Sequence, residues 1–136
     1  MDDYARLTRE SILASLEELT GDEAFLPWRD AYLRKAVADL DLEMTSAMLR
    51  VGGNPNVQEP WGDGLLHHLC HEFMVSRSTQ GERVLSVARA LLVGGADPNL
   101  VGCNNLRAYD LAAESCKPFA ELLLSSGASP EVRQFI

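Results

Sequence analysis

Side chains that bind metal ions or act as nucleophiles cluster between residues 67 and 71 of the sequence. On a helix, His67, Cys70 and His71 occupy positions i, i+3 and i+4 and therefore share one face. Two imidazoles and a thiolate can serve as three ligands for zinc. A metal site, and with it a metal-dependent enzyme, is therefore one interpretation of this cluster.

Other signatures of catalysis are missing from the sequence. Cys103 lies in the segment VGCNN, where we expect it to be exposed, but no basic or histidine neighbour in sequence would activate its thiol. The glycine pairs at 52–53 and 94–95 follow predicted helices, whereas phosphate binds where a helix begins. Neither a G-x-S-x-G motif nor a P-loop is present. We therefore predict no catalytic residue, and a thiol enzyme that uses Cys103 is kept as an alternative beside the metal enzyme.

The composition indicates one acidic domain that folds in water. The chain has 136 residues, of which 46% are hydrophobic and 24% charged, and its formal net charge is −8 at pH 7. Nucleic-acid binding needs clustered Lys and Arg, so this charge argues against nucleic acid and favours a basic partner. No apolar run is long enough to cross a membrane, the first residues do not resemble a secretory signal, and the number of cysteines is odd. We therefore expect a cytoplasmic protein that does not bind membranes.

Short helices joined by tight turns explain the spacing of the apolar residues. This spacing predicts one helix over about the first 20 residues, ended by Gly21, and further helices over 31–40 and 42–51. We expect residues 1–30 as a whole to form an N-terminal helical cap.

The segment between the first two helices is predicted to be a connector. Pro27 disfavours helical geometry at the residue before it, Leu26. We expect the large apolar side chains of this connector, Phe25, Leu26 and Trp28, to fold back against the core.

Three helix endings in the sequence share one pattern. They are AMLRVGGNPN, ALLVGGADPN and LLLSSGASP, at residues 47–56, 90–99 and 122–130. Each contains a glycine just past the last helical turn, where a left-handed conformation carries no Cβ penalty, namely Gly52, Gly95 and Gly127. GDGLLHHLC at 62–70 also aligns with NLRAYDLAA at 105–113. The repeating unit is therefore a pair of helices followed by a long turn.

These repeated segments resemble ankyrin repeats. GDGLLHHLC resembles the G-x-T-P-L-H-x-A-A signature of that family, and ALLVGGADPN resembles its L-L-L-x-x-G-A-D-x-N ending. The last unit carries Asp110 where the signature has histidine, as in the T-A-x-D-x-A variant. The resemblance covers residues 31–136 and implies an all-α stack of about three repeats. The units are about 31–61, 62–104 and 105–136, and the middle one carries an insertion near 74–83 that either lengthens its helices or projects as a loop.

The resemblance implies a structural role for most of the histidine–cysteine cluster. His67 falls on the signature histidine, which in that family bonds backbone between repeats, and Cys70 falls on a small buried position. His68 and His71 would then lie on the surface of the first helix. We accordingly expect no metal and no cofactor, and we assign structural roles to His67, Asp110 and the three glycines.

The resemblance also implies that the protein binds other proteins and is not an enzyme. The long turns and first helices of repeat stacks line an extended binding face. Trp61 is the expected anchor, because tryptophan is enriched at interface hot spots. The predicted contact residues are Glu59, Trp61, Asp63, His68, His71 and Glu72, with Leu100 and Val101 extending an apolar patch. The leading hypothesis is an inhibitor or immunity-type protein that masks a basic partner, and the alternative within this class is an adaptor or assembly subunit. No particular oligomeric state is predicted.

Overall fold

The described part of the protein is built from helices. The structure is a computed structural model that describes residues 7–131, apart from the side chains of residues 76–79, 104, 114 and 115. Its helices are α1 (Arg9–Ala14), α2 (Leu16–Thr20), α3 (Leu26–Ala38), α4 (Leu42–Arg50), α5 (Leu65–Val93), the short 3₁₀ helix η2 (Cys103–Asn105), α6 (Ala108–Ser115) and α7 (Lys117–Ser125). Within this range no strand forms, and two isolated bridges pair Gln58 with Gly64 and Val101 with Arg107. The predicted all-α class is confirmed for these residues.

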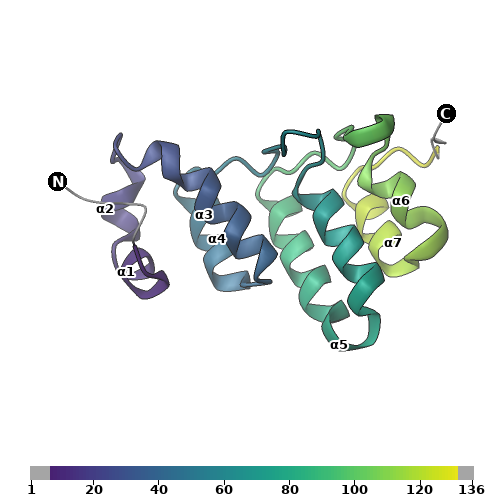
Figure 1. The fold of residues 1–136 in the computed structure, drawn as a ribbon, viewed down its shortest axis with the longest axis horizontal. Helices are drawn as coiled ribbons and strands as arrows, with labels where there is room; N and C mark the ends of the chain where they lie inside the picture. Colours follow the sequence, from purple (N-terminus) through teal and green to yellow (C-terminus); the bar gives the residue numbers. More distant parts are fainter. Residues whose placement is uncertain (1–6, 132–136) are drawn as a thin grey trace.

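The helices stand side by side in one elongated row, with the long turns gathered along one edge (Figure 1). Elements that follow one another in the chain also pack together, so α3 packs on α4, both pack on α5, and α5 packs on α6 and α7. A continuous core runs through the row, and its fully buried side chains include Leu33, Met48, Leu69, Leu91 and Leu123. This packing holds the turns in a fixed order along their edge.

Helix α5 doubles back on itself. A straight helix of its 29 residues would be about 43 Å long. Instead Gly64, which precedes α5, lies against the side chain of Leu100, which follows it, and Gly81 lies against the ring of Phe73. Figure 1 shows the resulting two arms, the first starting at the turns and the second returning to them. Residues 74–83, where the sequence predicts an insertion, therefore lie within the helical arms and do not project as a loop.

The three repeated glycines end helices in the way that the sequence predicts. Gly52, Gly95 and Gly127 have positive φ angles of 99°, 105° and 105°. The residue after each glycine donates its N–H to the carbonyl five positions earlier, namely Gly53 to Met48, Ala96 to Leu91 and Ala128 to Leu123, at 2.8, 2.9 and 2.9 Å. These are the bonds of the Schellman motif, which satisfies carbonyls that a helix end leaves free. Three helices thus enter their following turns with the same geometry.

Two asparagines tie each long turn to the next. Each side chain accepts from one backbone N–H and donates to one backbone carbonyl of the next turn. Asn56 accepts from Asp97 N (2.6 Å) and donates to Gly95 O (3.3 Å). Asn99 accepts from Ser129 N (2.8 Å) and donates to Gly127 O (3.2 Å). No role is predicted for these two residues from the sequence, although both end the repeated pattern N-P-N or D-P-N. Equivalent bonds at both junctions fix the spacing of neighbouring turns.

The N-terminal cap differs from its prediction. Instead of one helix, the described residues form α1 and α2, which break at Ser15, and residues 1–6 of the predicted helix lie outside the described range. The N–H of Ser15 bonds to Ile12 O, three residues back, at 3.1 Å. The side chain of Ser15 forms no capping hydrogen bond to α2, so a backbone turn makes the break. The apolar spacing alone therefore overestimated the length of this helix.

The predicted connector is also corrected, because α3 begins at Leu26 with Pro27 in its first turn. A helix does not need the N–H of its first residues, so proline is accepted there. Phe25 is fully buried as expected, whereas Leu26 and Trp28 are exposed. Starting the helix earlier turns these two side chains away from the core.

Candidate functional site

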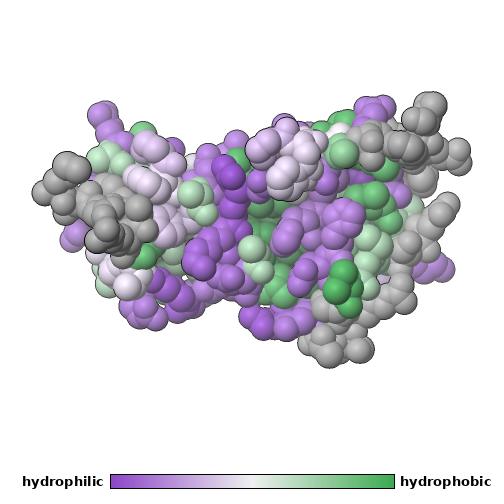
Figure 2. Space-filling model, in the orientation of Figure 1, coloured by the Kyte–Doolittle hydropathy of each residue, from purple (hydrophilic) through white to green (hydrophobic). Residues whose placement is uncertain are grey.

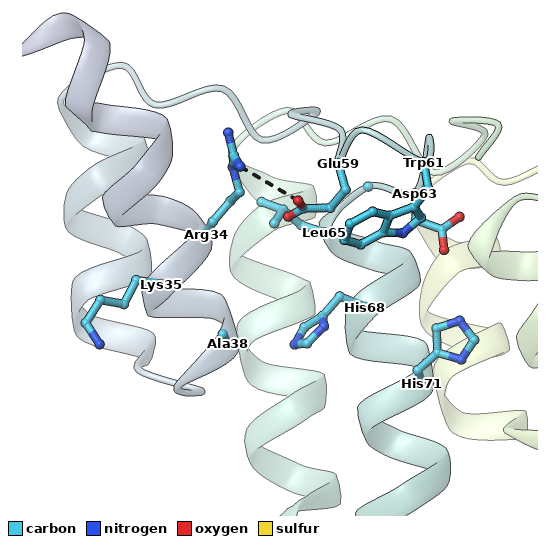
Figure 3. Close-up of a pocket in the computed structure, with 10 residues that line it drawn as sticks. Arg34, Lys35, Ala38, Glu59, Trp61, Asp63, Leu65, His68 and His71 are labelled. Atoms are coloured by element: carbon cyan, nitrogen blue, oxygen red, sulfur yellow. Dashed lines mark ion pairs between the residues drawn. The ribbon is translucent and has the colours of Figure 1, made fainter. Parts of the chain in front are cut away.

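A groove of about 430 Å³ lies between α3 and the first arm of α5. Its upper end is closed by the turn of residues 53–63, hereafter the 53–63 turn (Figure 3). The residues that line it are Arg34, Lys35, Ala38, Glu59, Trp61, Asp63, Gly64, Leu65, His68 and His71. Figure 2 shows this side of the molecule, where hydrophobic surface near the centre is flanked by hydrophilic residues. The groove therefore joins an apolar floor to a charged rim.

Trp61 is held in place by the 53–63 turn while its own side chain stays 62% exposed. Glu59 N donates to Asp63 O and Gly62 N donates to Glu59 O, both at 2.8 Å. The side chain of Gln58 adds bonds to Gly62 O (2.6 Å) and to Val101 O (3.2 Å). Trp61 is thus a large apolar group presented by a rigid turn, and tryptophan is seldom left so exposed without a partner.

Charged side chains of both signs face one another across the groove. Arg34 Nη1 lies 3.7 Å from Glu59 Oε2 and links α3 to the 53–63 turn. Lys35 Nζ pairs at 3.2 Å with Asp39 on its own helix. On the other edge, Asp63 Oδ1 accepts a hydrogen bond of 2.8 Å from Cys103 N. Positive charge is therefore supplied by α3, and negative charge by the turn beside Trp61.

His67 is buried and serves the backbone. Its Nδ1 accepts from Gly64 N at 3.1 Å, and its Nε2 lies 2.8 Å from Leu106 O in the following turn. A backbone N–H can only donate and a carbonyl can only accept, so the ring carries its hydrogen on Nε2. Both ring nitrogens are thus occupied by two successive turns.

The other members of the histidine–cysteine cluster divide between interior and surface. Cys70 is fully buried, and this burial, followed by the neighbouring Cys116 thiol, raises the pKa of Cys70 to about 12. His68 and His71 are exposed and line the groove. In the described part of the chain, no three His, Cys, Asp or Glu side chains are grouped closely enough to hold a metal ion. The helical spacing that suggested zinc does not bring these side chains to one point.

Five of the eight predicted contact residues meet at the groove: Glu59, Trp61, Asp63, His68 and His71. The other three, Glu72, Leu100 and Val101, do not line it. Leu100 packs its side chain against the backbone at Gly64, and Val101 pairs with Arg107 in an isolated bridge. Leu100 and Val101 thus contact neighbouring turns outside the groove, and their contact with a partner stays a prediction.

The wall formed by α3 was missed by the sequence analysis. It contributes Arg34, Lys35 and Ala38. A signal was present, because Lys35 and Ala38 lie 33 residues before His68 and His71, which is about the length of the first predicted unit, 31–61. Counting back from the predicted first-helix residues would have identified this wall.

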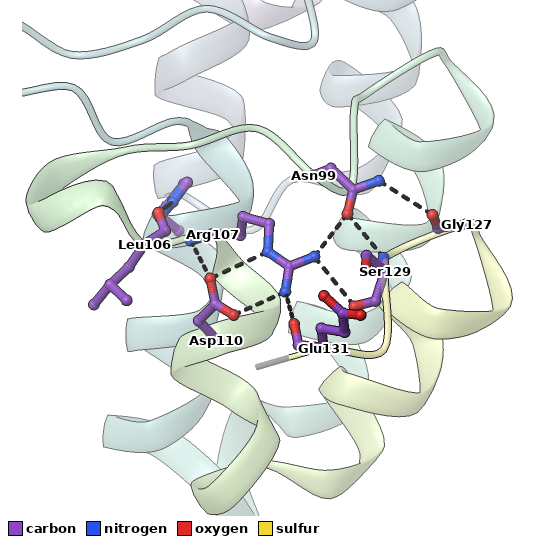
Figure 4. A network of polar contacts seen from close by, with 8 residues as sticks. Asn99, Leu106, Arg107, Asp110, Gly127, Ser129 and Glu131 are labelled. Carbon is purple, nitrogen blue, oxygen red and sulfur yellow. Dashed lines mark hydrogen bonds and ion pairs between the residues drawn. The ribbon is translucent and has the colours of Figure 1, made fainter. Parts of the chain in front are cut away.

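Asp110, assigned a structural role from the sequence, anchors a buried arginine (Figure 4). Its carboxylate accepts from Arg107 Nη2 at 2.8 Å, and this contact raises the pKa of the Arg107 guanidinium above its usual range. The same guanidinium donates to Asn99 Oδ1 (2.8 Å), Ser129 O (3.1 Å) and Glu131 O. Arg107 thereby connects the last two turns from inside the protein.

No protein-family model matches the chain, and no curated protein matches it. Within residues 7–131, none of the helices combines the length and the apolar character that crossing a membrane requires. The function is therefore argued from the groove and from the repeated turns.

Proposed function

We propose that the protein is a non-enzymatic protein-binding module of the ankyrin-repeat type whose binding surface is the groove between α3 and α5. The observation that carries this proposal is the 62% exposure of Trp61 on a turn that hydrogen bonds hold rigid. A rigid tryptophan gains a large contact area on binding and loses little conformational entropy. Such a group is a suitable anchor for a protein partner.

The repeat-type assignment is supported by the way the turns are joined. His67 bonds Gly64 N and Leu106 O, which is the role that the resemblance implies for the signature histidine. Asn56 and Asn99 join successive turns through equivalent pairs of bonds. Repeat stacks present their turns and first helices as one extended face, and the groove lies on such a face.

Binding is favoured over catalysis by the state of the reactive groups. Cys70 is buried with a raised pKa, so its thiol is protonated at neutral pH and shielded from substrates. Both nitrogens of His67 are engaged by backbone. Neither group can act as a nucleophile, base or metal ligand unless these contacts break.

The net charge of −8 favours a partner that is basic at its contact surface. Opposite charge steers association, and this attraction is screened over about 10 Å at 0.1 M salt. An acidic module of this size would suit an inhibitor or immunity-type protein that covers a basic surface. Association should accordingly slow as salt is added.

The test is affinity capture with the full chain from an extract of its source cells, followed by mass spectrometry. Trp61→Ala should lose the captured partner, with affinity falling about 10- to 100-fold for a central aromatic anchor. Trp28→Ala is the matched control, because Trp28 is also exposed but lies outside the groove. Circular dichroism should show the same helix content in all three proteins. A partner that binds Trp61→Ala as tightly as the unchanged chain would refute the proposal.

A further inference from the structure

The edge of the groove around Trp61 carries negative charge that is incompletely neutralised. Glu59 and Asp63 stand on either side of Trp61 in the 53–63 turn, and all three line the groove (Figure 3). Asp63 accepts one hydrogen bond, from Cys103 N, and among the described residues it forms no ion pair. A backbone N–H does not cancel a full charge, so the carboxylate still attracts a cation.

The ion pair of Glu59 is weak enough to be replaced. Its Oε2 lies 3.7 Å from Arg34 Nη1, which is beyond hydrogen-bond distance. The two side chains are 30% and 42% exposed, and exposed pairs of this kind add little stability. A cation that reached Glu59 at hydrogen-bond distance would therefore form a stronger contact than Arg34 does.

The other ionisable groups of the groove leave this edge open. Lys35 is bonded to Asp39, and Figure 3 shows it pointing away from Glu59. His68 and His71 belong to the α5 wall, below Trp61 in the same view. The fixed positive charges of the groove thus lie on α3, across from the indole ring.

The shape and surface of the groove suit a long side chain with a charged end. Leu65 and Ala38 supply apolar surface for an aliphatic stem, and the volume of about 430 Å³ exceeds that of one side chain. The exposed face of Trp61 attracts cations through its π electrons. A planar guanidinium can stack flat on an indole and still donate to a carboxylate from its edge, whereas an ammonium group has no plane that stacks.

We infer that the groove binds an arginine side chain of the partner, stacked on Trp61 and hydrogen-bonded to Glu59, with the charge of Asp63 adding attraction. This inference rests on the proposed function and names the chemical group that the site recognises. Arg34 would give up its long contact with Glu59 to the incoming guanidinium.

The test measures binding of the blocked peptide Ac-Gly-Arg-Gly-NH₂ by NMR. The full chain with Trp28→Phe is used, because the sequence has two tryptophans and Trp61 then gives the only indole N–H signal. The arginine peptide should shift this signal in a saturable way. The lysine peptide should bind at least threefold more weakly, and the citrulline peptide, which has the same shape without the charge, should not bind.

Variants of the two carboxylates separate the hydrogen bond expected from Glu59 from the charge attraction expected from Asp63. Glu59→Gln should weaken arginine-peptide binding at least fivefold. Asp63→Asn should weaken it about twofold to threefold, because the amide oxygen can keep the bond to Cys103 N while the charge is lost. Glu121→Gln on α7 is the control for a change in net charge, since Glu121 is exposed and lies outside the groove. It should leave binding unchanged.

Equal binding of the arginine and citrulline peptides, or unchanged binding by Glu59→Gln, would overturn the inference. So would a preference for the peptide with glutamate in place of arginine. Failure here is distinguishable from failure of the proposed function. If Trp61→Ala loses the captured partner but no arginine peptide binds, the function stands and the arginine assignment is wrong. If the arginine peptide binds but no partner depends on Trp61, the proposed function is the part that fails.

Discussion

Replacing His67 by alanine should destabilise the protein strongly, because the buried ring hydrogen-bonds backbone groups of two turns. The substitution leaves Gly64 N–H without its partner at a site that is only 1% exposed, and it leaves Leu106 C=O with only the hydrogen bond from Gly102 N. The unpaired Gly64 N–H costs about 1–3 kcal/mol, the bond lost to Leu106 O costs about 1 kcal/mol, and the missing ring leaves a cavity that adds to this. We therefore expect a loss of about 3–5 kcal/mol from a total stability of about 5–15 kcal/mol.

Urea unfolding followed by circular dichroism measures this loss. With a slope of about 2 kcal/mol per molar, the midpoint should fall by about 2 M urea. The control is His68→Ala, since His68 is the next residue on the same helix and is exposed in the groove. It should change stability by no more than about 0.5 kcal/mol. His67→Asn should recover part of the loss, because its amide oxygen can accept from Gly64 N.

Equal midpoints for His67→Ala and His68→Ala would refute this reasoning. A chelator experiment tests the alternative interpretation, in which His67 binds a metal ion. If a chelator lowered the stability of the unchanged protein as much as His67→Ala does, and if one equivalent of zinc were released, His67 would be a ligand. We expect a chelator to leave the urea midpoint of the unchanged protein where it is.

Three further substitutions test other contacts. Asn99→Ala should lower the free energy of unfolding by about 2–4 kcal/mol in urea, because it removes the hydrogen-bond partner of two backbone groups in the next turn and of a buried arginine. Hydrogen bonds from Arg9 lower the pKa of Asp41, so the stability that this pair gives is present at neutral pH and is lost as pH falls below about 4. In thermal melts, Arg9→Ala should therefore lose less stability than the unchanged protein between pH 5 and pH 3. An equal loss in both proteins would contradict this prediction. The pKa of Cys70 is raised from 9.0 to about 12, so the protonated thiol gives stability below pH 9 that is lost as pH rises toward 12. The melting temperature of Cys70→Ala should therefore decline less between pH 9 and 11 than that of the unchanged protein. The same decline in both proteins would contradict this prediction.

Features that depend on short stretches of sequence could be predicted. The ends of three helices follow from Gly52, Gly95 and Gly127, because positive φ is a local requirement that glycine meets. The interior position of Cys70 and the exposure of Cys103 also follow from where each falls in the repeated unit. Patterns of this kind are visible without knowing which helix packs on which.

Features that depend on distant neighbours could not be predicted in the same way. The reversal within α5 is inferred from contacts such as Gly64 with Leu100, and the apolar spacing of one segment carries no such information. Arg107 looks like a surface residue in sequence, yet it is buried because Asp110 on the helix that follows it and two other segments, at Asn99 and Ser129, supply its acceptors. A charged side chain is acceptable in a core only when those partners are in place.

The same distinction applies to the candidate site. Trp61 could be selected because tryptophan is enriched at interface hot spots, and Glu59 and Asp63 followed as its neighbours in the turn. Arg34 was missed as a groove residue, since only the packing of α3 beside α5 brings it within 3.7 Å of Glu59. The residues that one turn contributes to the groove can thus be predicted from the sequence, whereas the residues of the opposite wall can be identified only when the packing of α3 beside α5 is known.

The reversal of α5 is a place where residues can be added to the helix with little loss of stability. Residues added to both arms would extend them away from the edge where Asn56 and Asn99 hold the turns in register (Figure 1). Insertions there should therefore be tolerated during evolution more readily than insertions in the 53–63 turn. For protein engineering, the same point is a suitable site to graft a tag or a foreign loop, because the groove beside Trp61 would keep its shape.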